Sequence, residues 1–419
     1  MRPLVALAGL VLVLFLACRG PAPDIPDLTG TAWAGPGAEC EYIAVSIDPG
    51  GEDLAYRFAF DGEHGDWSLP VPSGTEVVAS MVWPGTGVHS VAAQAGNRSG
   101  ATSAWSETLR VSCLPEPGYP DSLAGRIETN SDLEETVLSL DGRWLYATDW
   151  DGESLEVYDA ASLTRVTAVF LGLNGEPGPL FISPDGQHLL VGTSDQIAVV
   201  NTSDNSVERI IDGLGAVSDP EMSPDSRTLY IIGRDYRLFA VDMNSSMVRD
   251  SFQLDDDTEA LCVNPVSGVV YAITYSTGEI TCLRPDDLSV CARFAAGMVN
   301  VWFVTAARDG RRLYVAGEDM CGISVVSTHA CRQIGFISFN GFVECRPVLF
   351  PSGRFVMVGV GPEFEEDEKL AVCRNDDLAV AAYLPLDDTP TGVHFSPDGM
   401  KMYVCYWNEI VVYRFGGQE

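Results

Sequence analysis

The sequence predicts an all-β protein in which a small β-sandwich is followed by a seven-bladed β-propeller. Short apolar runs alternate with polar residues at a period of two, which is typical of half-buried strands. One turn motif recurs seven times in the C-terminal two thirds of the chain. The 41 Gly and 25 Pro residues suit a fold with many turns. No apolar run has the three- and four-residue spacing of a helix.

The composition supports a packed core and excludes one class of partner. Hydrophobic residues make up 46% of the chain and charged residues 20%, so a globular fold is expected. The net charge of -34 comes from 59 acidic and 25 basic residues. A surface this acidic repels phosphate backbones and anionic lipids, so nucleic-acid binding is not expected.

Residues 1–18 are expected to be a targeting segment. The apolar run 4–17 is shorter than the roughly 20 residues that a membrane-spanning helix needs. It ends in Phe15, Leu16, Ala17 and Cys18 and resembles a bacterial lipoprotein signal, although that family prefers Leu in place of Phe15 and a smaller residue in place of Leu16. The resemblance implies lipidation of Cys18 and peripheral anchoring in the cell envelope, in the periplasm or on the cell surface. Simple cleavage and secretion is the alternative.

The cysteines agree with export. Eleven are present, and lipidation of Cys18 would leave an even number. Three disulfides are predicted, with buried free thiols as the alternative to each. Cys40–Cys113 would join the ends of the sandwich. Cys282–Cys291 would cross a hairpin, and Cys321–Cys345 would bridge two blades. No C-x-x-C spacing points to zinc or redox chemistry.

The sandwich is predicted over 38–114, after a linker at 19–37. Five alternating runs are expected to form antiparallel strands, at 42–46, 55–60, 76–80, 89–95 and 107–112. The segment 48–58, Trp67, the segment 85–91 and Trp105 resemble bacterial immunoglobulin-like domains of the PKD and fibronectin type III kind. This resemblance implies a spacer or adhesion module without catalysis.

The propeller is predicted over 120–416 from the recurring turn. The turns end at Gly142, Gly186, Ser226, Gly268, Gly310, Gly353 and Gly399, which are 40 to 46 residues apart. This period suits blades of four strands that bury their faces on one another. The seventh unit lacks a fourth strand, and an extra run at 123–129 precedes the first unit. We therefore expect this run to pair with the strand containing Val411 and to close the ring.

The repeated pattern resembles a known propeller family. Ser-Pro-Asp-Gly is followed by Leu-Tyr-Val or a variant and then by Ile-Xaa-Val, as in the YVTN/YncE-like (lactonase-like) propellers. The resemblance covers about 300 residues and implies a seven-bladed ring. It says little about function, because that family includes surface-layer proteins, binding scaffolds and a few enzymes. No unit carries the paired motifs of WD40 repeats.

The predicted site lies where the innermost strands begin. Loops expected at this mouth carry Glu134, Glu135, Asp219, Glu221, Glu259, Trp302, Glu344 and Arg346. Their carboxylates would attract a cation or a basic partner, whereas a solvated acidic rim is the alternative. His394 is the one histidine expected in an innermost strand, and a structural role is expected for it. No catalytic motif is present, and no metal or cofactor is predicted.

The leading functional hypothesis is an envelope-anchored binding or scaffold protein that uses the propeller as an interaction platform. Its partner would be a protein or a small molecule, and the lipid anchor would be its contact with the membrane. A purely structural role in a surface layer is one alternative. The other is a periplasmic hydrolase or lyase of the lactonase-like group. That reading requires His, Asp, Asn and Glu side chains to converge on one point.

Overall fold

The computed structural model is made of β-strands joined by turns and loops. It describes residues 21–30, 33–34, 39–85, 87–113, 120–129, 132–193, 195–215, 220–233, 235–317, 321–361 and 368–415. These residues contain no helix. Within them, therefore, no helical segment has the length and apolarity that crossing a membrane requires. The prediction of an all-β protein is confirmed.

The chain forms two compact units. The N-terminal unit takes in the described residues up to Val111, except 33–34, 82–85 and 87. The C-terminal unit takes in those residues and the described residues from Ser112 onward.

The first eight strands of the chain form two sheets. The first has the strand order β1-β3-β6 and the second β2-β8-β7-β4-β5. The strands are β1 (Asp27–Gly30), β2 (Trp33–Ala34), β3 (Glu39–Val45), β4 (Leu54–Phe60), β5 (Glu63–His64), β6 (Val77–Val82), β7 (Gly87–Asn97) and β8 (Leu109–Cys113). All five runs expected from the alternating pattern are strands, β3, β4, β6, β7 and β8. The expected linker 19–37 also contains two strands, since β1 pairs with β3 and β2 pairs with β8.

Seven antiparallel sheets occupy the described part of the C-terminal unit, and we number them in chain order. Sheet 1 consists of β10 (Leu133–Leu138), β11 (Trp144–Asp149), β12 (Ser154–Asp159) and β13 (Thr164–Phe170). Sheet 2 consists of β14 (Leu180–Ile182), β15 (His188–Gly192), β16 (Gln196–Asn201) and β17 (Ser206–Asp212). Sheet 3 consists of β18 (Glu221–Met222), β19 (Thr228–Ile232), β20 (Arg237–Asp242) and β21 (Met247–Gln253).

Sheets 4 and 5 have the same order. They consist of β22 (Thr258–Val263), β23 (Val270–Thr274), β24 (Glu279–Leu283) and β25 (Val290–Ala295), then β26 (Val301–Ala306), β27 (Arg312–Gly317), β28 (Gly322–Ser327) and β29 (Arg332–Ser338). Sheet 6 has five strands because its first strand is split: β30 (Phe342–Val343), β31 (Val348–Leu349), β32 (Phe355–Gly361), β33 (Lys369–Arg374) and β34 (Val380–Pro385).

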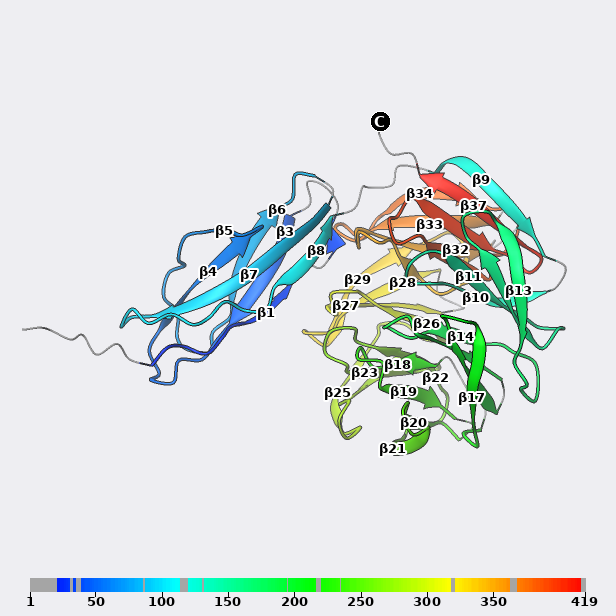
Figure 1. Cartoon of the computed structure of the whole chain (residues 1–419), viewed down its shortest axis with the longest axis horizontal. Helices are drawn as coiled ribbons and strands as arrows, with labels where there is room; N and C mark the ends of the chain where they lie inside the picture. The colour runs from blue at the N-terminus through cyan, green and yellow to red at the C-terminus, as the bar shows by residue number, and fades with distance from the viewer. Residues whose placement is uncertain are drawn as a thin grey trace, which may run out of the picture. The chain divides into compact units, whose positions relative to one another are not determined.

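Sheet 7 combines strands from both ends of the C-terminal unit. Its order is β35 (Gly392–Phe395), β36 (Lys401–Cys405), β37 (Glu409–Phe415) and then β9 (Pro120–Glu128). Ile127 pairs with Ile410, and Arg126 pairs with Val411. Figure 1 shows β9 in cyan beside the red β37. The predicted pairing of the early run with the strand of Val411 is therefore confirmed.

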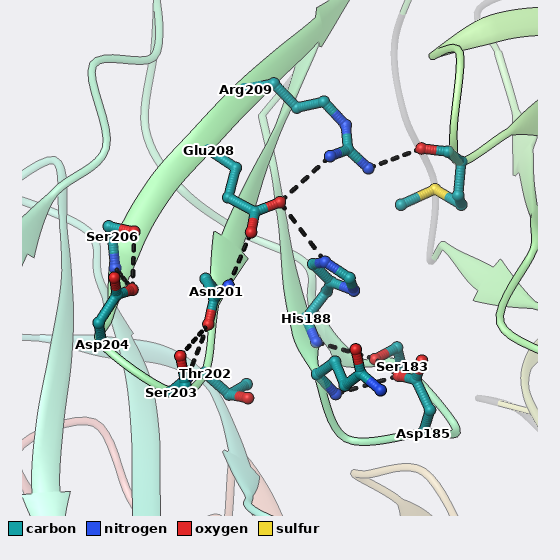
Figure 2. Close-up of polar contacts among 12 residues, drawn as sticks. Ser183, Asp185, His188, Asn201, Thr202, Ser203, Asp204, Ser206, Glu208 and Arg209 are labelled. Atoms are coloured by element: carbon teal, nitrogen blue, oxygen red, sulfur yellow. Dashed lines mark hydrogen bonds and ion pairs between the residues drawn. The ribbon is translucent and has the colours of Figure 1, made fainter.

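The recurring turn is held by its own side chains. In sheet 2 the Ser183 hydroxyl donates to Asp185 Oδ1 over 2.6 Å, and the amide of His188 donates to Ser183 Oγ over 3.0 Å (Figure 2). Gly186 has a φ of 71°, a left-handed conformation that glycine adopts at low cost. Ser, Asp and Gly thus recur because each satisfies a need of the turn between the first two strands of a sheet.

Polar contacts also join neighbouring sheets along their outer strands. Glu208 accepts a hydrogen bond from Asn201 Nδ2 at 2.7 Å and lies 3.2 Å from Arg209 Nη1. The second terminal nitrogen of Arg209, Nη2, donates to the carbonyl oxygen of Met243 over 2.7 Å, so this bond links sheet 2 to sheet 3. Figure 2 shows this chain of contacts, which also reaches His188.

Each sheet shares a hydrophobic cluster with the next, and sheet 7 shares one with sheet 1. The residue four positions after the end of each turn, or three positions in the fourth unit, lies in a different one of these clusters: Tyr146, Leu190, Tyr230, Tyr271, Tyr314, Met357 and Tyr403. All seven are buried. The repeat therefore marks the residue that packs a sheet against its successor.

Two of these tyrosines should respond differently to loss of the hydroxyl. Tyr403 donates to the carbonyl oxygen of Ala160 over 3.1 Å, whereas the buried Tyr146 hydroxyl has no hydrogen-bond partner among the described residues. Tyr403→Phe should lower the free energy of unfolding by about 1 kcal/mol, and Tyr146→Phe should leave it unchanged or raise it. Urea titrations measure both, and a larger loss in Tyr146→Phe would contradict this account.

Candidate functional site

A cavity of about 750 Å³ lies among the innermost strands of the C-terminal unit. Residues of β10, β18, β22, β26, β31 and β35 line it, so six of the seven sheets contribute. Its charged lining groups are Glu134, Glu135, Glu221, Glu344, Arg308 and Arg346. Phe303 and Trp407 add aromatic surface to the wall. A mixed, concave lining of this kind is typical of ligand sites.

The structure brings together most of the predicted mouth residues. Glu134, Glu135, Glu221, Glu344 and Arg346 line the cavity. Glu259 and Trp302 do not, and Asp219 lies outside the described residues.

The two described residues that do not line the cavity both lie at bulges. The register of β22 shifts between Thr258 and Ala260, and that of β26 shifts between Val301 and Phe303. Glu259 and Trp302 are the inserted residues, and a bulge re-aims the side chain that it carries. The half-exposed Trp302 instead packs edge-on against Tyr275, with ring centroids 5.2 Å apart.

An ion pair crosses from one side of the cavity to another. Arg346, which follows β30, places Nη1 3.2 Å from Oε1 of Glu221 in β18. The two residues lie 125 positions apart and belong to sheets 6 and 3, which are not neighbours. Only 13% of the Glu221 side chain is exposed, so removing the arginine would leave a poorly solvated carboxylate.

Burial also acts on two further charged groups of the lining. It raises the pKa of Glu134, and the nearby negative charge of Glu176 raises it further. Burial lowers the pKa of Arg308. The sequence reasoning missed Arg308, although the repeats carry a signal: five of the other six turns have Pro at this position, namely Pro184, Pro224, Pro265, Pro351 and Pro397.

His394 lines the cavity and contacts a hydroxyl. Its Nε2 lies 2.7 Å from Thr136 Oγ1 of β10, which links sheet 7 to sheet 1. Burial lowers the pKa of His394 to about 4. The imidazole is therefore neutral near pH 7, and its burial makes it a weaker base than an exposed histidine.

The cysteine predictions fare differently. Cys282 and Cys291 are not opposite each other, because β24 pairs Cys282 with Ala292. The predicted cross-strand register is wrong, since a bulge inserts Cys291 into β25. Cys345 lines the cavity and accepts a hydrogen bond at Sγ from the amide of Gly359 over 3.2 Å, while Cys321 is half-buried and does not line it.

The remaining disulfide predictions stay predictions. The structure holds Cys321 and Cys345 as thiols, and it also holds the buried Cys40 of β3 and Cys113 of β8 as thiols. Cys18 lies outside the described residues. Within the part of the chain that the structure describes, no three His, Cys, Asp or Glu side chains converge closely enough to hold a metal ion.

Comparison with known proteins adds no assignment. No protein-family model matches this sequence, and no curated protein matches it.

Proposed function

We propose that the C-terminal unit is a seven-bladed propeller of the YVTN/YncE-like kind and that it serves as a binding platform on an exported envelope protein. In this proposal Cys18 carries the lipid anchor, and the N-terminal unit is an immunoglobulin-like spacer. The seven sheets with their chain of shared clusters support the propeller, and the pairing of β9 with β37 supports its closure.

The cavity is the observation that carries the binding function. Four glutamates and two arginines line it, and Arg346 pairs with Glu221. The chain as a whole carries a net charge of -34, so its field concentrates cations around an acidic concave surface. Aromatic rings such as those of Phe303 and Trp407 attract cations by cation–π interaction. The ligand class that fits is a compact molecule or side chain with a basic group.

Calorimetric titration of the purified protein with spermidine and with an arginine-containing dipeptide tests this function. Binding should weaken as salt rises. Glu134→Gln and Glu344→Gln should each weaken it about tenfold, equal to about 1.4 kcal/mol. Glu259→Gln is the matched control, because Glu259 also has its pKa raised by burial but does not line the cavity.

Two outcomes would refute a basic ligand. One is the absence of binding by either probe at low salt. The other is an equal loss of affinity in Glu259→Gln, which would mean that the effect comes from net charge alone.

Hydrolysis is a second candidate function, favoured by one contact. The hydrogen bond between His394 and Thr136 joins a neutral imidazole to a hydroxyl at the cavity wall. A base and a hydroxyl at this separation are the starting geometry for nucleophilic attack. Turnover of a simple lactone or ester that is lost in both His394→Ala and Thr136→Val would support it.

A further inference from the structure

In several sheets a leucine in the turn before the last strand packs on the neighbouring sheet, and in sheet 5 a cysteine takes the place of this leucine. In sheets 1 to 6 the turn before the last strand contains a residue with positive φ, and Leu163, Leu288, Cys331 and Leu378 occupy this place in sheets 1, 4, 5 and 6. The equivalent side chain of sheet 1 packs on sheet 7, because a Cβ on Gly125 would collide with Leu163. In the same way Leu378 of sheet 6 packs on Gly335 of sheet 5.

The strand register identifies where Cys331 should pack. Each of the two glycines directly follows a bulge residue that has no partner in the strand pairing. Ala124 is this unpaired residue before Gly125, and Ile334 is the one before Gly335. In sheet 4 Ala292 occupies the position of these glycines, and Cys291 before it is the bulge residue without a pairing partner. The outermost strands β25 and β29 lie next to each other. By this equivalence Cys331, which directly precedes β29, faces the bulge that contains Cys291.

The environment of Cys282 agrees with this placement. Cys282 is the strand partner of Ala292, and its sulfur is buried in the cluster between sheets 4 and 5. Burial raises the pKa of Cys282, and charges on Cys291 and Cys331 raise it further. The Cys291 thiol also donates to the carbonyl oxygen of Cys282 over 3.4 Å.

We propose that Cys291 and Cys331 form a disulfide that staples sheet 4 to sheet 5. Cys291 is exposed and Cys331 half-exposed, so both can meet an oxidant. In the structure each thiol donates to a backbone carbonyl, Cys291 to Cys282 at 3.4 Å and Cys331 to Thr328 at 3.5 Å. Cys282 is a poor partner because only 3% of its surface is exposed and thiolates, not thiols, react.

The reaction is thiol–disulfide exchange with a small-molecule disulfide. The Cys331 thiolate attacks one sulfur of the oxidant and releases the first thiol of that molecule. The Cys291 thiolate then attacks the Cys331 sulfur of the mixed disulfide and releases the second thiol. The two protein thiols lose two electrons and two protons, and the oxidant gains them. This site is independent of the cavity and of the proposed ligand.

Peptide mapping of the full chain tests the staple. The purified protein is treated with oxidised glutathione, its remaining thiols are alkylated, and the digest is analysed without reduction. A peptide pair that links Cys291 to Cys331 is expected, and it should persist in Cys282→Ser. The oxidised protein should melt roughly 5 °C above the reduced protein, because the bridge constrains the unfolded chain.

Other linkages or the absence of linkage would overturn the proposal. A bridge that involves Cys282, or full alkylation of Cys291 and Cys331 after oxidation, would each do so. Cys331→Ser keeps a small polar side chain at the turn and should fold, and its melting temperature should no longer respond to glutathione. A response equal to that of the original protein would assign the shift to other cysteines.

Discussion

Replacing Ile127 with aspartate is expected to destabilise the C-terminal unit by about 4 kcal/mol or more. Only 4% of Ile127 is exposed, and it lies in the cluster that joins sheet 7 to sheet 1 with Leu133 and Tyr403. The substitution removes a buried aliphatic side chain and places a carboxylate among the hydrophobic side chains of this cluster. Urea denaturation followed by circular dichroism measures the loss.

Leu123→Asp is the matched control for this experiment. Leu123 lies on the same strand, pairs with Tyr413 and is 52% exposed, so its replacement should cost less than about 1 kcal/mol. Equal stability of the two variants would mean that β9 contributes little to the packing of sheet 7 on sheet 1.

Acid should destabilise the C-terminal unit partly through His394. Burial lowers the pKa of His394 from 6.5 to about 4, so the unfolded chain binds the proton more readily between these values. The stability that His394 contributes is complete above pH 6.5 and is lost as the pH falls to 4, by about 2–3 kcal/mol. The slope of unfolding free energy against pH should therefore be smaller in His394→Gln.

Two comparisons isolate this effect. His329→Gln should keep the original slope because His329 is exposed in a turn. Glu134 and Glu259, whose pKa values are raised, act in the opposite direction on acidification, and both are present in the two histidine variants. A slope that is unchanged in His394→Gln would show that this imidazole is not desolvated.

The strand pairing was predictable where sequence patterns reflect local chemistry. The Ser-Pro-Asp-Gly turn fixes where Ser183 and Asp185 lie, because their hydrogen bonds are made within the turn itself. The pairing of Ile127 with sheet 7 followed from counting strands, since the last unit lacked one and an extra run preceded the first.

The details that the sequence did not predict depend on bulges and on distant packing. Glu259, Trp302 and Cys291 are each a single inserted residue at a bulge, and the alternating pattern of the sequence does not mark where such an insertion falls. The contact between Glu221 and Arg346 joins residues of two sheets that are not neighbours, so no local pattern encodes it. Arg308 was visible only as a departure from Pro at a repeated position.

The register of β9 on β37 has a consequence for the path of the chain. The two strands are antiparallel, and Pro120 pairs with Phe415. The first and last strands of the unit therefore begin and finish side by side, and a short peptide is long enough to join them. A circularly permuted chain that is opened in the turn 255–257 would keep every strand pair of the seven sheets. Its new ends would lie between sheets 3 and 4.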